Sequence, residues 1–147
     1  IFTIKLPYVP APSAKAPKAA PPITAQERIL IIDDRRDAIL PLNKMLQMDG
    51  HTVATALDGP TGLTMAREFE PNVVLCDIGL PGAMNGYAVS RALRATPQTS
   101  SAYLVAVTGY GHEEAKRMAK EAGFDYHLTK PLGRQHLRDL LARRPRF

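Results

Sequence analysis

From residue 28 onward the chain alternates between short apolar runs and longer segments with helical spacing, and few folds accommodate this alternation. The runs are about one strand long, and several contain no polar residue, which is typical of strands buried on both faces. The alternation predicts an α/β fold, a doubly wound five-stranded parallel sheet with helices on both faces. The runs are ILII (29–32), TVATA (52–56), VVLC (73–76), YLVAV (103–107) and FDYHL (124–128).

Three of the intervening segments place apolar residues three and four positions apart, as the inner face of a helix requires. We expect these residues in the core, with the polar positions between them facing water. The faces are Ile39, Leu42, Met45 and Leu46; Ala115, Met118, Ala119 and Ala122; and Leu137, Leu140 and Leu141.

The ends of the chain differ in composition from its middle. Six of the 13 prolines lie between residues 7 and 22, among Ala, Ser and Lys, so residues 9–27 are predicted to form an extended Pro/Ala-rich linker. The folded domain is predicted over residues 28–143, followed by a basic tail at 144–147.

The positive charge of the chain is concentrated at its ends. Residues 27–142 hold 13 Lys and Arg against 14 Asp and Glu, whereas the remaining basic residues precede Glu27 or follow residue 142. A nearly neutral domain argues against nucleic-acid binding. One cysteine, Cys76, excludes an internal disulfide, and no apolar run is long enough to span a bilayer, so no membrane contact is expected.

Five polar residues follow the apolar runs at the points where four of the five predicted strands end: Asp33, Asp34, Asp77, Thr108 and Lys130. The carboxyl ends of parallel strands meet at one edge of a sheet, where ligands of such folds bind. Three carboxylates together require a cation, and a set of oxygen ligands suits Mg²⁺. The lysine and the hydroxyl supply donors for phosphoryl oxygens, and an aspartate can be the nucleophile.

In this order, these residues resemble the receiver domain of two-component response regulators. The acidic pair, the single Asp in DIGLPG, the Thr-Gly pair and the Lys-Pro pair carry the resemblance over residues 28–143. It implies a flavodoxin-like (βα)5 fold with strand order 2-1-3-4-5. It also implies that the domain signals by switching conformation and, as a stand-alone domain, is not an enzyme beyond its own phosphoryl transfer.

The resemblance assigns a role to each site residue. Asp77 would accept the phosphoryl group; Asp34, Asp77 and the backbone carbonyl of Gly79 would bind Mg²⁺, with Asp33 assisting through water. The partner would be a histidine kinase or a histidine phosphotransfer domain, and phosphorylation could produce a homodimer.

The remaining assignments concern the phosphoryl group and the conformational switch. Lys130 would pair with the phosphoryl group, Thr108 would donate a hydrogen bond to it, and His127 occupies the position of the usually aromatic switch side chain. In this family, side chains two residues after the acceptor and two after the threonine hold or obstruct the hydrolytic water. Here these are Gly79 and Tyr110, which predicts a long-lived phosphoryl group.

Two departures from a plain receiver domain are visible. The loop at residues 82–85 is one residue longer than is usual in the family. The N-terminal stretch IFTIKLP is similar to the last strand of the ATP-binding domain of histidine kinases, so residues 1–8 would be the remnant of an upstream kinase domain. The chain would then come from a hybrid histidine kinase and lie in the cytoplasm, with a membrane sensor as a possible tether.

Other interpretations of the same residues stay open. An acidic pair can cap a helix, although capping explains one acid and leaves Asp77 and Lys130 unexplained. A Mg²⁺ phosphatase with an Asp nucleophile needs a second acid close by, and residues 78–82 contain none. A docking or dimerisation module that works without phosphate is the third possibility. Cys76 is expected to be a small buried hydrophobic residue, with a redox role as the alternative.

Overall fold

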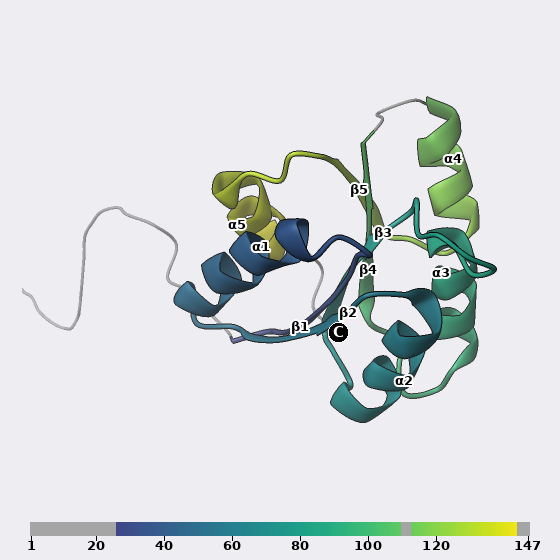
Figure 1. The fold of residues 1–147 in the computed structure, drawn as a ribbon, viewed down its shortest axis with the longest axis horizontal. Helices are drawn as coiled ribbons and strands as arrows, with labels where there is room; N and C mark the ends of the chain where they lie inside the picture. Colours follow the sequence, from purple (N-terminus) through teal and green to yellow (C-terminus); the bar gives the residue numbers. More distant parts are fainter. Residues whose placement is uncertain (1–25, 110–112, 144–147) are drawn as a thin grey trace, which may run out of the picture.

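The computed structural model describes residues 26–109 and 113–143, and these residues form five strands and five helices in strict alternation (Figure 1). All strand pairs are parallel, and the sheet order is β2-β1-β3-β4-β5, which confirms the predicted fold. The elements are β1 (Arg28–Ile32), α1 (Arg36–Met48), β2 (Thr52–Ala56), α2 (Gly59–Phe69), β3 (Val73–Asp77), α3 (Gly86–Ala95), β4 (Tyr103–Thr108), α4 (Glu113–Glu121), β5 (Tyr126–Thr129) and α5 (Arg134–Arg143).

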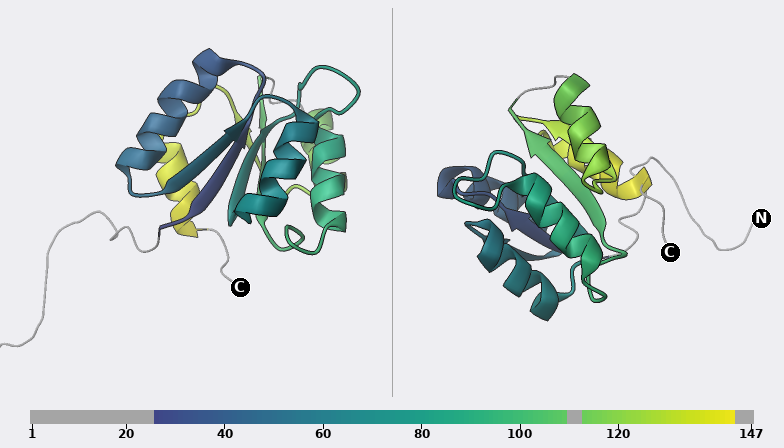
Figure 2. Two further views of the ribbon diagram at one scale, coloured as in Figure 1. Left: turned by 60° about the horizontal axis from the view of Figure 1, so that its bottom comes forward. Right: turned by 90° about the vertical axis from the view of Figure 1, so that its right-hand side faces the viewer.

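Helices cover both faces of the sheet (Figures 1 and 2). Helices α1 and α5 lie together on one face, and α2, α3 and α4 lie on the other. Alternate strand residues point to opposite faces, so β1 gives Ile29 and Ile31 to the core under α1 and α5 and Leu30 and Ile32 to the other core. All four side chains are at most 2% exposed. Burial of the central strands on both faces explains their unbroken apolar sequence.

The predicted helix faces are largely confirmed. Ile39 and Leu46 of α1 and the three leucines of α5 are buried. The prediction for Met118 is wrong, because its side chain is 37% exposed. Helix α4 packs through the small residue Ala119, with Ala122 just beyond its end. The contact of α4 with the core is therefore made by its small residues, and Met118 of the same apolar face stays more than a third exposed.

A buried acid joins the first helix to the last. Asp49, the C-cap of α1, is 6% exposed and accepts hydrogen bonds from Arg134 at 2.5 Å and from Arg138 at 2.9 Å. The hydrogen bonds from Arg138 and Arg134 outweigh burial and hold the pKa of Asp49 well below its usual value. The three residues, here called the Asp49 clasp, fix α1 against α5.

Arg94 organises the other end of the sheet, away from the carboxyl ends of the strands. Arg94 of α3 donates to the backbone carbonyls of Ser100, Ala102 and Gly123, at 2.8, 2.8 and 2.9 Å, and to the carboxylate of Asp125 at 2.6 Å. One guanidinium therefore holds the loops before β4 and β5.

The N-terminal end of the described residues is hydrogen-bonded to the fold. Glu27, the last residue of the predicted linker, is 3% exposed, and its backbone N–H donates to His51 Nδ1 at 3.1 Å. The predicted kinase remnant at 1–8, most of the predicted linker and the basic tail at 144–147 lie outside the described residues. Within the described parts of the chain, no helix combines the length and the apolar character needed to cross a bilayer.

Candidate functional site

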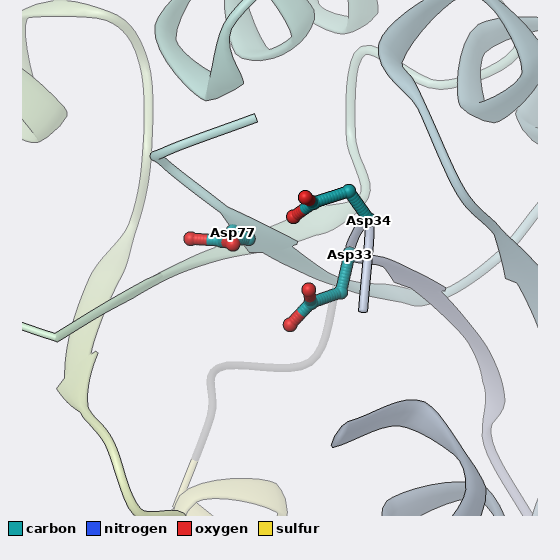
Figure 3. Close-up of side chains that lie close together, drawn as sticks. All are labelled: Asp33, Asp34 and Asp77. Carbon is teal, nitrogen blue, oxygen red and sulfur yellow. The ribbon is translucent and has the colours of Figure 1, made fainter. Parts of the chain in front are cut away.

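Three acids meet at the carboxyl ends of β1 and β3 (Figure 3). Asp33 and Asp34 directly follow β1, and Asp77 is the last residue of β3. Each offers a carboxylate oxygen that lies within 4.8 Å of the others. Asp33 and Asp77 are 7% and 9% exposed, whereas Asp34 is exposed to solvent. The sheet order places β1 beside β3, which is why acids far apart in sequence converge.

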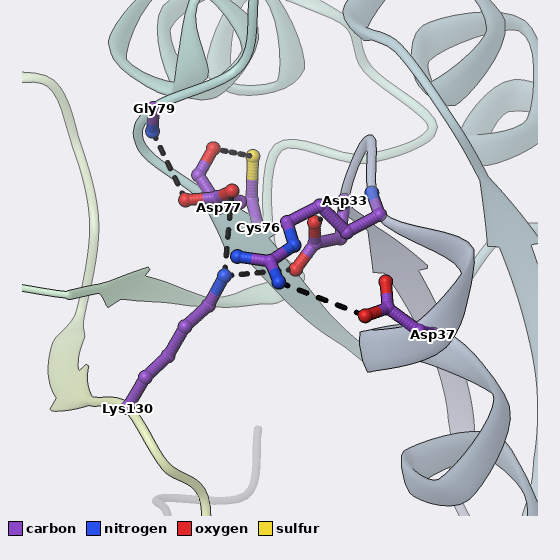
Figure 4. A network of polar contacts seen from close by, with 7 residues as sticks. Asp33, Asp37, Cys76, Asp77, Gly79 and Lys130 are labelled. Atoms are coloured by element: carbon purple, nitrogen blue, oxygen red, sulfur yellow. Dashed lines mark hydrogen bonds and ion pairs between the residues drawn. The ribbon is translucent and has the colours of Figure 1, made fainter.

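A lysine lies against two of these acids. Lys130, just after β5, places Nζ 3.1 Å from Asp33 Oδ2 and 3.5 Å from Asp77 Oδ2 (Figure 4). Burial lowers the pKa of Lys130, but the hydrogen bond to Asp33 and the charges of Asp77 and Asp33 outweigh it and raise the pKa above its usual value. Lys130 therefore stays charged at neutral pH. One ammonium group against three carboxylates leaves the cluster negative, and this suits a divalent cation.

Backbone groups fix the orientation of the acids. The N–H of Gly79 donates to Asp77 Oδ1 at 3.0 Å, and the N–H of Arg35 donates to Asp33 Oδ1 at 3.0 Å. A Cβ added to Gly79 would lie 3.7 Å from Asp77 Oδ1, in ordinary contact. Position 79 thus borders the carboxylate of Asp77 directly. The metal-ligand role of the Gly79 carbonyl stays a prediction.

Thr108 and His127 lie on the two strands at the β5 side of the site. Thr108 ends β4, is 8% exposed, and its carbonyl accepts a hydrogen bond from the backbone N–H of Lys130 at 2.8 Å. His127 pairs with Ala106, two residues before Thr108. Its Nε2 is buried and has no hydrogen-bond partner among the described residues. Burial and the charge of Lys116 lower the pKa of His127, which favours the neutral imidazole.

The loop between β3 and α3 packs tightly against the end of β3. Gly86, the first residue of α3, lies so close that a Cβ there would come 2.5 Å from the carbonyl oxygen of Asp77. No side chain fits without moving this backbone, so glycine sets the distance from α3 to the site. The longer loop is anchored by Met84, which packs against the core beside Gly59.

Cys76 is fully buried before Asp77, as expected of a small hydrophobic residue. Burial, followed by the charges of Asp77 and Asp33, raises the pKa of its thiol well above the usual value. A buried thiol that resists deprotonation is a poor nucleophile, which weakens the redox interpretation.

The structure brings together the predicted residues Asp33, Asp34, Asp77 and Lys130, while Tyr110 lies outside the described residues. Sequence reasoning missed Arg35, whose backbone N–H donates a hydrogen bond to Asp33. The sequence did contain a signal for this residue, because two arginines at the start of a helix are unusual.

The sequence of this chain is similar to those of known proteins. Residues 29–142 match the family described as the response regulator receiver domain. The protein PilH of Pseudomonas aeruginosa is 38% identical over 110 residues, which is 75% of this chain and 90% of PilH.

Solved structures give the same result for the fold. The chemotaxis protein CheY4 of Vibrio cholerae superposes with a TM-score of 0.76 at 28% identity and covers 81% of this chain and 98% of its own. The receiver domain of a sensor histidine kinase from Pseudomonas aeruginosa, with a magnesium ion coordinated in its active site cleft, has a TM-score of 0.73 at 26% identity; the match covers 81% of this chain and 97% of that one.

Proposed function

This chain belongs to the family of response regulator receiver domains of two-component signalling, and from this premise we propose that it accepts a phosphoryl group from a phosphohistidine onto Asp77. The observation that carries the proposal is the position of Lys130 Nζ, 3.1 Å from Asp33 and 3.5 Å from Asp77, beside the acidic cluster. An ammonium group held there is ready to bind a phosphoryl group attached to Asp77.

The proposed step is a displacement at phosphorus. An oxygen of Asp77 forms the new O–P bond while the P–N bond to the donor imidazole breaks. The electron pair of that bond stays on the departing nitrogen, which takes a proton from solvent. Lys130 and Thr108 would bind phosphoryl oxygens, so the contribution of the protein is positioning and charge stabilisation.

Mg²⁺ fits the acidic cluster. The three carboxylates supply hard oxygen ligands that lie within 4.8 Å of one another, and Lys130 compensates part of their charge. We assign Asp34, Asp77 and the Gly79 carbonyl as ligands, with Asp33 acting through water. A bound Mg²⁺ would neutralise charge on the transferring group.

The signal would be a shift between two packings of the β4 and β5 surface. Thr108 would turn toward the phosphoryl group, and His127, whose Nε2 is buried without a hydrogen-bond partner among the described residues, would turn inward. A donor imidazole can come from a histidine kinase or a histidine phosphotransfer domain. A homodimer of phosphorylated domains is a further possibility.

We also propose a hybrid histidine kinase as the parent protein, with the receiver at 28–143, the linker at 9–27 and the kinase remnant at 1–8. The sequence IFTIKLP supports this origin, and a similar receiver structure comes from a sensor histidine kinase. On this proposal the domain lies in the cytoplasm, where the parent protein can tether it to a membrane sensor.

Treatment with a small phosphodonor in Mg²⁺, followed by intact mass measurement, tests the function. The expected result is the gain of one phosphoryl group that is stable in acid and labile in base. Steady release of inorganic phosphate with many turnovers would instead indicate a phosphatase. Absence of modification would indicate a docking module that works without phosphate.

Asp34→Ala should weaken Mg²⁺ binding at least about tenfold, because it removes a charged ligand. The metal-free variant should be as stable as the wild type or more stable, since fewer like charges then meet at the site. Thermal melts with and without Mg²⁺ measure both effects. The control is Asp139→Ala, which removes an acid of α5 outside the cluster. An equal Mg²⁺-induced rise in Tm for wild type and Asp34→Ala would contradict the metal assignment.

The phosphoryl group should be long-lived, because Gly79 has no side chain to hold a hydrolytic water and Tyr110 would obstruct its approach. Gly79→Asn combined with Tyr110→Gln should shorten the lifetime about tenfold or more. The side chain at 79 would begin 3.7 Å from Asp77 Oδ1, where it can orient water. Decay after removal of the donor is the measurement. Equal decay of both proteins would refute the role of these positions.

A further inference from the structure

Two arginines begin α1 against the usual rules for a helix start. Arg35 is the N-cap, makes no side-chain capping hydrogen bond, and is followed by Arg36 as the first helical residue. Helix starts favour Asp, Asn, Ser or Thr, and the positive end of the helix dipole disfavours cations. Residues whose charge disfavours the structure in which they lie are expected mainly at functional sites. The start of α1 therefore calls for a functional explanation.

The backbone of Arg35 is bonded to the site. Its N–H donates to Asp33 Oδ1 at 3.0 Å, while Asp33 Oδ2 binds Lys130 at 3.1 Å. Arg35 and Lys130 therefore bind the two oxygens of the same carboxylate. That carboxylate offers an oxygen within 4.8 Å of one from Asp77. The backbone of Arg35 therefore lies one hydrogen bond from a carboxylate that borders Asp77, and the long stem of its side chain gives the guanidinium reach toward the site.

In the resting arrangement the guanidinium of Arg35 is held weakly. Its ion pair with Asp37, one of the contacts drawn in Figure 4, has an N–O distance of 3.6 Å, and the two side chains are 65% and 79% exposed. Exposed ion pairs of this kind contribute little. Arg35 can leave Asp37 at low cost when a stronger anion appears nearby.

Phosphorylation creates that anion. With a divalent cation bound, the cation and Lys130 balance the three carboxylates of the site. Phosphorylation replaces the single charge of Asp77 by about two charges on the phosphoryl group, so the site becomes negative again.

We propose that Arg35 is a second phosphoryl-binding cation, which leaves Asp37 and donates to a phosphoryl oxygen on Asp77 from the side of α1. This role rests on the proposed function and adds a binding residue to the same site. A guanidinium offers a planar pair of donors suited to phosphoryl oxygens, whereas Lys130 acts as a point charge. Arg35 would stabilise the phosphorylated state selectively, because no phosphoryl oxygen is present before transfer.

Equilibrium binding of beryllofluoride, a phosphoryl mimic, tests this role without turnover. Calorimetric titrations in Mg²⁺ should show about tenfold weaker binding by Arg35→Ala and a smaller loss by Arg35→Lys. Arg36→Ala is the matched control, since it removes the neighbouring cation from the same helix start, and it should bind as the wild type does. Asp37→Ala should bind at least as tightly, because it frees Arg35.

Mg²⁺ titrations without beryllofluoride separate phosphoryl binding from general charge balance. Arg35→Ala should bind Mg²⁺ at least as tightly as the wild type, because a cation near the cluster has been removed. Equal beryllofluoride affinity of Arg35→Ala and wild type, or equal losses in Arg35→Ala and Arg36→Ala, would overturn the role of Arg35 and leave the proposed function intact. Failure of the wild type to bind beryllofluoride would overturn both.

Discussion

Asp77→Asn should reduce phosphorylation by a small phosphodonor to below detection and leave the fold intact. An amide keeps the shape of the carboxylate but lacks its nucleophilic charge. The backbone N–H of Gly79 can still donate to the remaining oxygen, whereas the ion pair to Lys130 is lost. Because Lys130 also binds Asp33, the side chain keeps a partner, and the change in stability should be small. Intact mass measures the modification, and far-UV circular dichroism measures the fold.

Asp139→Asn is a suitable control, since Asp139 lies on α5 and bonds to Gln135 away from the cluster. This variant should be modified as readily as the wild type. A phosphoryl group gained by Asp77→Asn, mapped by proteolysis to Asp33 or Asp34, would show that the acceptor is assigned wrongly.

Asp49→Asn should lower the free energy of unfolding by about 1.5–3 kcal/mol at neutral pH, the range for hydrogen bonds to charged groups. The buried carboxylate loses its charge while two guanidinium groups remain beside it. The lower part of the range is expected, because the side chains of Arg134 and Arg138 are 46% and 42% exposed and water screens them. Urea unfolding at pH 7 measures the difference.

The pH dependence of this difference follows from the lowered pKa of Asp49. A carboxyl whose pKa is lower in the folded state stabilises the fold fully above its unfolded pKa, which is about 3.9. The stabilisation is lost as the pH falls below that value and through the folded pKa. Wild type and Asp49→Asn should therefore differ at pH 7 and converge in acid. Asp139→Asn, which changes an acid of α5 outside the Asp49 clasp, should show no such convergence. A difference that stays constant down to pH 2 would exclude a charge effect.

The sequence predicts the sheet and the acidic cluster well for one reason. Both can be recognised from short, contiguous segments of the sequence, such as an apolar run that ends in an acid. Once strands alternate with helices, the carboxyl ends of the strands must share one edge, so Asp33 and Asp77 meet although they are 44 positions apart in the sequence. Once the strands are in place, the side chains of Asp33 and Asp77 lie close together without any further signal in the sequence.

The features that the sequence did not reveal depend on tertiary contacts between polar residues. Asp49 stands in QMDGH, which reads as an exposed turn, and its partners are 85 and 89 positions away. Arg94 resembles a surface residue of α3, yet it binds carbonyls of two loops. Met118 shares the spacing of a buried face, but its side chain is 37% exposed, and Ala119 makes the contact of α4 with the core. Periodicity shows which residues can share a face, not which of them the sheet covers.

The pairing of α1 with α5, which the Asp49 clasp fixes, also has a consequence for synthesis on the ribosome. The core beneath α1 is completed by Leu137, Leu140 and Leu141, so the first described helix of the domain waits for the last one. Translation proceeds at about 5–20 residues per second, and Ile29 and Ile31 stay incompletely covered for the seconds before α5 emerges. A nascent chain stalled before Arg134 would expose this surface to chaperones and to aggregation. Release of α5 from the ribosome is then the event that closes the domain.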